Sequence, residues 1–323
     1  MDTYNPQKLP FFPQPYPGES LYSVLCRYHV RSGNATAAKT IRQLFGGYAS
    51  LSSTLLLPSS SVLRCLDTWS SACPDLRQTN FLWAHTAFSL CSLREYSLYR
   101  YIFFDDYKPA VASRKMRYSS FQQAWIQHAS QEIRFCPMCA AEQKKIYGES
   151  YWQVIPQLDG VVYCPVHQMR ILSSSIHVRD FRYSFFPADT VLASPTIGTI
   201  ADPIVPSPYS EIQNQPDILI AMSRCIQYLW QHLPEYSGIW FLLNRYRQLL
   251  SIPKTHDLWQ SANVVREKLL QNHQVKLVNW LLSLNETVEP RYIFFSQFSL
   301  AQHAVMISLL APSLKAFFSS NLL

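Results

Sequence analysis

The sequence predicts a mainly α-helical protein with a small β element, and three observations support this fold class. Glycine is scarce, with 8 residues in 323, whereas all-β folds depend on many glycine-containing turns. Apolar residues recur at helical spacing over much of the chain. Between the helical segments, two short cysteine-containing pairs stand among strand-like residues. A hydrophobic content of 48% is enough to form a core.

The N-terminal part, residues 1–132, is predicted to contain several helices. Pro17-Gly18-Glu19-Ser20 suits a helix start, and the apolar residues from Leu21 to Tyr28 follow on one face. Ser32-Gly33-Asn34 ends that helix. A second helix ends at Gly46-Gly47, a third is capped by Ser59–Ser61, and a fourth surrounds Phe81–Phe88.

The C-terminal part, residues 217–323, is predicted to be a second helical domain. Six prolines between Pro187 and Pro216 predict an extended connector over 181–216. An apolar stripe from Ile218 to Leu233 then marks a helix. Further helices are predicted at 238–250, 257–271, 274–284 and 296–310. The chain stops at Leu323 inside an apolar stretch, so we expect either a truncated or a short natural form.

Two pairs of metal-ligand residues lie between these helical parts. Cys136-Pro137-Met138-Cys139 is followed, 24 residues later, by Cys164-Pro165-Val166-His167. Each pair has the spacing of a zinc knuckle, and together they supply the four ligands of a tetrahedral zinc site. Strand-like residues lead into each pair, at 133–135 and 161–163. The pattern predicts a zinc ribbon over 133–180 with Cys136, Cys139, Cys164 and His167 as ligands.

Two other interpretations of these pairs remain. They could be unrelated buried residues, or they could hold a catalytic zinc ion, which needs an open coordination position and a nearby general base. Four protein ligands favour a structural ion. No phosphate-binding loop, HExxH or GxSxG motif is present, so we predict that the protein is not an enzyme. The remaining cysteines are expected to pack in the core: Cys26, Cys65, Cys73, Cys91 and Cys225.

The charge balance is compatible with a nucleic-acid partner. The net charge is +7 and the sequence pI is about 8.9. Basic residues interleaved with tyrosines form a candidate DNA-contacting stretch, although a solvated surface would have the same pattern: Arg94, Arg100, Lys108, Arg114, Lys115 and Arg117. No run of 18 apolar residues occurs and the start is polar, so we expect a cytoplasmic protein without membrane contact.

Several of these motifs resemble the TniQ/TnsD family when they are taken in order. They are the run Pro13–Ser23 with Arg27 and Gly33, then His85-Thr86, then the block Phe135–His167 with Tyr147-Gly148-Glu149 and Tyr151-Trp152. Together they extend from residue 11 to about 170. The segment Thr255–Leu258 is similar to the longer TnsD-type members, but more loosely.

The resemblance implies a bacterial target-selecting adaptor in DNA transposition. Such a protein binds double-stranded target DNA, or a target-bound complex, and recruits the AAA+ ATPase TnsC, which passes the target to the transposase subunits. Some relatives attach to an RNA-guided CRISPR complex, and these can carry a second cysteine cluster. Residues 168–224 contain no cysteine, so we expect the TnsD-like, attachment-site type.

Four aromatic residues near the N-terminus are candidates for contact with the ATPase: Phe11, Phe12, Tyr16 and Tyr22. They could equally cover the core of their own domain. A different function also remains open, that of a zinc-containing, sequence-specific DNA-binding regulator unrelated to transposition. A helix-turn-helix at residues 20–46 would suit that function.

Overall fold

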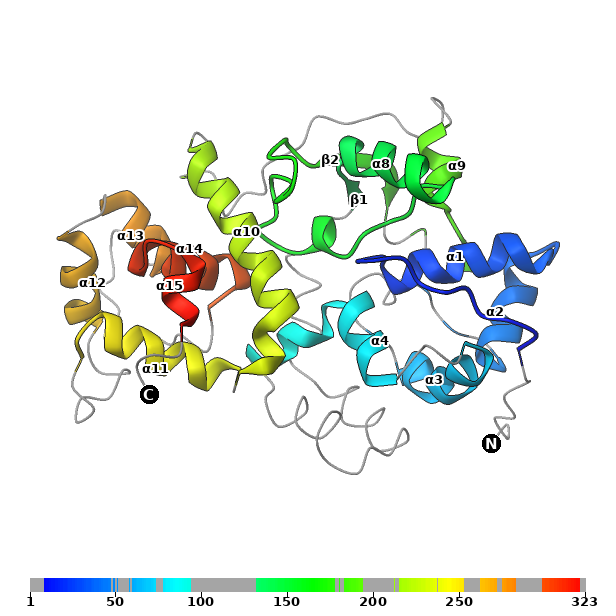
Figure 1. Cartoon of the computed structure of the whole chain (residues 1–323), viewed down its shortest axis with the longest axis horizontal. Coiled ribbons are helices and arrows are strands. Elements are labelled where there is room, and N and C mark those ends of the chain that lie inside the picture. Colours follow the sequence, from blue (N-terminus) through cyan, green and yellow to red (C-terminus); the bar gives the residue numbers. More distant parts are fainter. Residues whose placement is uncertain are drawn as a thin grey trace. The chain divides into compact units, whose positions relative to one another are not determined.

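The computed structural model describes most of the chain and groups it into two compact units. The described residues are 9–47, 49, 51, 58, 60–73, 78–93, 132–177, 180, 183–193, 212, 215–236, 238–252, 262–271, 275–282 and 298–319. The first unit comprises 1–91, 95–158 and 169–203, and the second comprises 92–94, 159–168 and 204–323. Helices dominate both units (Figure 1), which confirms the predicted fold class.

The first unit is built from short helices and one small sheet. Its elements are α1 (Leu21–Ser32), α2 (Ala37–Phe45), α3 (Ser60–Ala72), α4 (Gln78–His85), the 3-10 helix η2 (Ala87–Leu93), β1 (Glu132–Phe135), α8 (Pro137–Tyr147), the 3-10 helix η3 (Ile155–Gln157), β2 (Leu172–His177) and α9 (Ala188–Ala193). The start and the end expected for the first helix are present. Ser20 caps α1 by accepting a hydrogen bond from Ser23 N, and Gly33 follows in the left-handed conformation.

The two strands pair antiparallel, with Arg134 opposite Ser173 and Phe135 opposite Leu172. Residues 133–135 therefore form the strand predicted before the first cysteine pair. The second strand lies after the second pair, not before it. Val161 and Val162, which were expected to form that strand, are instead buried in the second unit without being part of the sheet. Their apolar character matches burial and not strand formation.

The core of the first unit is an aromatic cluster around α3. The ring of Phe12 stacks on Trp69 at 5.3 Å between centroids and meets Phe81 edge-on at 6.1 Å. Trp69 is fully buried and its Nε1 donates to Leu44 O at the end of α2. Such rings contribute large buried apolar area, so the helices α2, α3 and α4 are held together by the N-terminal segment as well as by one another.

The second unit is mainly helical in its described residues. Its elements are α10 (Pro216–His232), the 3-10 helix η6 (Leu233–Glu235), α11 (Ile239–Leu249), α12 (Ala262–Leu270), α13 (Val275–Leu281), α14 (Leu300–Leu310) and α15 (Leu314–Phe318). The stripe predicted on α10 is buried at Met222, Cys225, Leu229 and Leu233. Among the described residues, no helix has the length and apolar character needed to cross a membrane.

One helix lies inside the segment that its prolines marked as an extended connector. Helix α9 begins directly after Pro187, and Val191 N donates to the Pro187 carbonyl oxygen. A proline just before a helix removes no helical hydrogen bond, because the first N–H groups of a helix have no intrahelical partner. Proline density alone was therefore a poor guide at 188–193. Residues 194–211 lie outside the described residues.

Gly160 is predicted to be intolerant of any side chain. Its φ is +82°, and a Cβ there would lie 2.8 Å from Ala301 Cβ and 2.9 Å from Ile226 Cδ1. Gly160→Ala is expected to destabilise the protein by roughly 2–4 kcal/mol, from the left-handed backbone and the overpacked α10–α14 contact together. Thermal or denaturant unfolding would measure the loss.

Gly148→Ala is the matched control for this prediction. Its φ of +78° is similar, but no atom lies within 4 Å of an added Cβ. That variant should lose only about 1–2 kcal/mol. Equal losses at the two glycines would show that the contact with Ala301 and Ile226 is not tight.

Candidate metal centre

The first pair of predicted ligands sits where a strand becomes a helix. Cys136 directly follows β1 and is the N-cap residue of α8, in an extended conformation with φ −98° and ψ 121°. Pro137 occupies the first helical turn, where its missing N–H costs nothing. Cys139 lies in the same turn. The predicted tight turn is therefore the start of a helix, which sequence analysis did not foresee.

The second pair forms a tight turn. His167 N donates to Cys164 Sγ at 3.4 Å, and Gln168 N donates to Cys164 O at 2.8 Å. Gln168 adopts a positive φ of 55° to complete the turn. A backbone N–H that points at the sulfur stabilises a thiolate, so this turn is suited to hold Cys164 in the form that binds metal.

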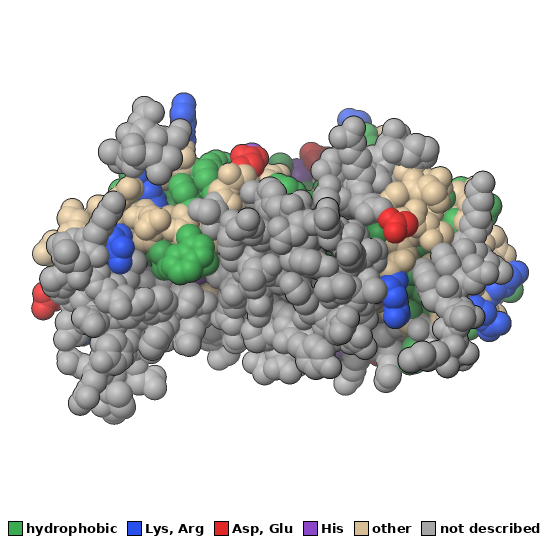
Figure 2. Space-filling view, turned by 90° about the horizontal axis from the view of Figure 1, so that it is seen from below, with side chains coloured by type: hydrophobic (Ala, Val, Ile, Leu, Met, Phe, Trp, Pro, Cys, Tyr) green, Lys and Arg blue, Asp and Glu red, His purple; other side chains and the backbone are tan. Residues whose placement is uncertain are grey.

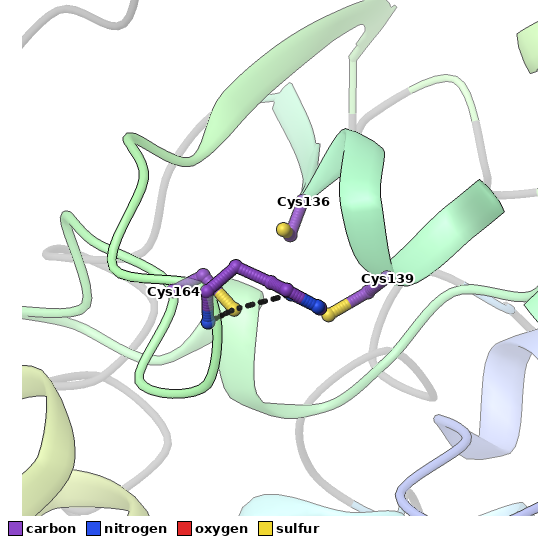
Figure 3. A group of neighbouring side chains, drawn as sticks. Cys136, Cys139 and Cys164 are labelled. Carbon is purple, nitrogen blue, oxygen red and sulfur yellow. Dashed lines mark hydrogen bonds between the residues drawn. The ribbon is translucent and has the colours of Figure 1, made fainter. Parts of the chain in front are cut away.

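The structure brings the four predicted ligands together. One ligand atom from each of Cys136, Cys139, Cys164 and His167 lies within 4.8 Å of all the others. Figure 3 shows the three cysteine sulfurs directed toward one region. Cys164 Sγ is 3.6 Å from His167 Nδ1. A tetrahedral zinc ion bonded to sulfur at about 2.3 Å and to nitrogen at about 2.0–2.1 Å places these two ligand atoms about 3.6 Å apart, so the observed separation fits a shared ion.

The donor set fits a structural zinc ion. Three sulfurs and one imidazole nitrogen are the soft and borderline ligands that zinc accepts in closed, four-coordinate sites. Cys136 and Cys164 are buried, while Cys139 and His167 are partly exposed. With four protein donors there is no open position for a reacting water. A closed set of four donors can therefore hold protein segments together.

Polar contacts and one aromatic side chain connect α8 to its surroundings. The ring of Tyr147 lies 4.4 Å from that of Tyr16 and 5.9 Å from that of Tyr151 between centroids. Gln143 is the buried side chain of this helix, and its Oε1 accepts from Tyr151 N. Ser150 Oγ donates to Ala140 O, and Lys144 Nζ donates to both carboxylate oxygens of Asp189 in α9. Gln143 is the one side chain that this helix buries, so its other side chains are at least partly exposed.

A second polar cluster, the Glu19–Arg27–Glu149 network, lies beside α1 and was not predicted. Arg27 Nη1 donates to Glu19 Oε2 at 2.8 Å, and Arg27 Nε donates to Glu149 Oε1 at 2.9 Å. Arg31 Nη2 donates to the same oxygen of Glu149 at 2.5 Å. Glu19 is fully buried and Arg27 is nearly so. The network connects the start of the chain to the residues that follow α8.

Burial dominates the electrostatics of Glu19. It raises the pKa of Glu19 to about 7, although the Arg27 guanidinium and the Tyr16 N–H, which donates to Oε2, act to lower it. The other oxygen, Oε1, is buried without a hydrogen-bond partner among the described residues. Nearby, His85 Nδ1 lies 2.7 Å from Glu19 O, and burial lowers the pKa of His85 to about 4.

Backbone pairing attaches the N-terminal motif to the segment after α8. Ser20 N donates to Trp152 O at 2.7 Å, and Val154 N donates to Gly18 O at 3.0 Å. Trp152 N donates in turn to Ser23 Oγ. The motif from Pro13 to Ser23 and the block around Tyr151-Trp152, which are far apart in sequence, are thus one structural feature.

The four aromatic candidates for partner contact have different positions. Phe12 and Tyr22 are buried in the core of the first unit, and Tyr22 OH donates to Ser184 O. For these two, the structure favours the role of covering their own domain. Phe11 is partly exposed and stacks on Tyr28 at 5.0 Å. Tyr16 is also partly exposed, and the Arg27 guanidinium lies 3.7 Å from its ring centre.

The predicted DNA-contacting stretch lies outside the described residues. Its six residues fall between 94 and 117, outside the described residues: Arg94, Arg100, Lys108, Arg114, Lys115 and Arg117. Among the other cysteines, Cys26, Cys65, Cys73 and Cys225 are buried as expected, and the side chain of Cys91 is not described.

The mainly helical chain, with its two-stranded sheet near the Cys3His cluster, defines a helical protein that contains a zinc-ribbon-like element. Residues 10–171 match the model of the TniQ family. This segment contains both cysteine pairs and the Glu19–Arg27–Glu149 network, and it covers half of the chain. The chain belongs to the TniQ family.

Sequence comparison relates this chain to a curated transposition protein. It is the transposon Tn7 transposition protein TnsD of Escherichia coli, which is 25% identical over 190 residues. The aligned region covers 54% of this chain but only 34% of that relative. The chain thus spans about a third of the length of the relative that it matches.

Proposed function

We propose that this protein selects target sites for DNA transposition, as an adaptor that binds double-stranded target DNA and recruits an AAA+ ATPase of the TnsC type. The TniQ match over residues 10–171 carries the proposal. The similarity to TnsD, itself a transposition protein, supports it. On this proposal the protein acts by binding and not by catalysis, in the bacterial cytoplasm where the chromosomal target lies.

Within this function, we assign the metal cluster a structural role. The ion at Cys136, Cys139, Cys164 and His167 would be zinc, held by a closed set of four donors. It would fix the start of α8, whose other contacts are mostly polar, so that the TniQ segment presents one surface to its partners. The absence of cysteine from residues 168–224 supports a TnsD-like protein that reads a fixed attachment site.

For the ATPase contact, we retain the two aromatic candidates that are partly exposed. Phe11 and Tyr16 lie on a proline-rich segment that backbone hydrogen bonds hold in place. A rigid aromatic side chain loses little conformational entropy on binding, and such residues are common hot spots at protein interfaces. Phe11 is the better target for mutation, because Tyr16 also belongs to the Glu19–Arg27–Glu149 network through its hydroxyl bond to Glu149.

The full zinc-loaded chain is expected to retain the TnsC-type ATPase of its own transposon in a pulldown with ATP and duplex DNA. Phe11→Ala should weaken that association by roughly 1–3 kcal/mol, the range for an interface aromatic. Titration by biolayer interferometry would measure it. Trp240→Ala is the matched control, since Trp240 is 57% exposed but lies on α11 of the second unit.

Two outcomes would contradict these proposals. If the full chain retained no ATPase in any nucleotide state, the adaptor function would be wrong. If Phe11→Ala bound as well as wild type and Trp240→Ala did not, the contact would have to be sought on α11. A transposition assay with and without this protein, in which insertion at one site is scored by sequencing, tests target selection separately.

A further inference from the structure

We propose that α1 and α2 form a helix-turn-helix whose exposed α2 face lies in the major groove of duplex DNA. This inference rests on the proposed function, because it locates the DNA contact that target selection needs. Four residues, Gly33 to Thr36, connect the two helices, and in Figure 1 α2 runs at a steep angle to α1. In proteins with this motif the second helix enters the major groove, while the first crosses the phosphate backbone.

The charge on this helix pair is suited to a polyanion. Residues 20–66 contain no Asp or Glu. On the exposed side of α2 lie Lys39 and Arg42, one turn apart, and neither forms an ion pair with a described residue. In Figure 2, Lys and Arg side chains gather at the right-hand edge, on the side where Figure 1 places α1 and α2. Cations without acidic neighbours are available to phosphates.

The shape of α2 also allows close approach. Thr40, Ile41, Leu44 and Phe45 are buried on its inner face, where the ring of Phe45 meets Trp69 edge-on. The exposed residues that precede Lys39 are small: Ala35 and Thr36 in the turn, and Ala38 on the outer face of α2. The outer face therefore has no bulky residue that would hold the helix away from base edges.

The turn between the helices is held rigid by side-chain hydrogen bonds. Asn34 Nδ2 donates to Gln43 Oε1 at 2.8 Å and to Thr40 Oγ1 at 3.1 Å. His29 Nδ1 lies 2.7 Å from the same Thr40 oxygen. A preorganised surface loses less entropy on binding. These bonds fix the direction of α2 relative to α1, as base recognition requires.

Duplex DNA fits this face better than an acidic protein does. The centre of a protein interface is usually apolar and enriched in aromatic residues. The exposed residues of α2 are Ala38, Lys39 and Arg42, and none is aromatic. Cations around small residues suit a groove in which phosphates flank base edges.

The first test removes the two cations. Lys39→Gln together with Arg42→Gln, in the full chain, is compared with wild type on a fluorescein-labelled duplex of random sequence. Binding is followed by fluorescence polarisation over a range of salt. We expect at least about a tenfold loss of affinity and a fall of about 2 in the slope of log affinity against log salt. Lys145→Gln with Lys315→Gln is the control, because both residues are exposed.

The second test separates DNA contact from helix stability. Ala38 is exposed in the first turn of α2, which has no acidic residue. Ala38→Glu favours the helix through its dipole, so the melting temperature should stay the same or rise. The same carboxylate would face phosphates, so duplex affinity should fall by at least about tenfold. A purely structural role of α2 predicts no loss.

The outcomes distinguish this inference from the proposed function. If both variants bound the duplex like wild type, α2 would not be the DNA contact, and the adaptor could still use another surface. If the control pair lost as much affinity as the α2 pair, the contact would be diffuse and the inference would be overturned. ATPase retention should be unchanged in all variants, and a loss limited to the α2 variants would instead make this face a protein interface.

Discussion

Cys136→Ser is expected to abolish binding of one zinc ion per chain and to unfold α8. An isolated helix of 11 residues is marginal in water, and Gln143 is the buried side chain of α8. Apart from the ring of Tyr147, which packs on Tyr16 and Tyr151 at the far end of the helix, little apolar packing is available to hold α8 once its first turn loses the ion. Zinc contributes about 10–16 kcal/mol of apparent binding energy in finger peptides, so its loss should exceed the stability of this segment.

Native mass spectrometry measures the metal, and hydrogen exchange measures the helix. The amides of residues 140–147 should exchange at least about a hundredfold faster in Cys136→Ser than in wild type, while α10 and α14 keep their protection. Cys225→Ala is the matched control. Cys225 is fully buried in α10, so that variant should lose stability but retain zinc. Wild type purified without zinc, or protected amides in Cys136→Ser, would refute the structural metal site.

The ligand positions could be predicted from sequence because two ligands three positions apart are a local property of the chain. In each pair, Cys136–Cys139 and Cys164–His167, one turn of the chain is enough to bring the two ligands to the same ion. The surrounding elements could not be predicted in the same way. Helix α8 has no apolar stripe because it buries Gln143 and no apolar side chain. Strand β2, with the sequence Leu-Ser-Ser-Ser-Ile-His, has little β propensity and forms because β1 lies beside it.

The helices of both units show where sequence reasoning is strong. Caps and apolar periodicity located α1, α2 and α10 within a few residues, since these features act locally. The Glu19–Arg27–Glu149 network shows where it is weak. Arg27 and Glu149 are 122 positions apart, and only the folded chain brings them together. Their separate membership of family motifs was the one available signal, and it did not indicate a contact.

Arg27→Met is expected to destabilise the first unit by roughly 3–5 kcal/mol at neutral pH. The variant loses the charged hydrogen bonds of a nearly buried guanidinium to Glu19 and Glu149, and the fully buried Glu19 must take up a proton. The pH dependence follows from the pKa of Glu19, which burial raises from 4.5 to about 7 even with Arg27 present. A raised carboxyl pKa means that stability is lost as pH rises from the unfolded value to the folded value.

Without Arg27 the folded pKa of Glu19 moves higher still, so this variant continues to lose stability above pH 7 after wild type has stopped. The difference in the free energy of unfolding between wild type and Arg27→Met should therefore widen above pH 7, by up to about 1.4 kcal/mol per pH unit. Urea unfolding from pH 5 to 9 measures it. Arg31→Met is the control, since Arg31 binds the same Glu149 oxygen but is 44% exposed and should contribute only about 0–1 kcal/mol. Equal and pH-independent losses in both variants would mean that Glu19 and Arg27 contribute packing alone, and that the network does not depend on the buried charge.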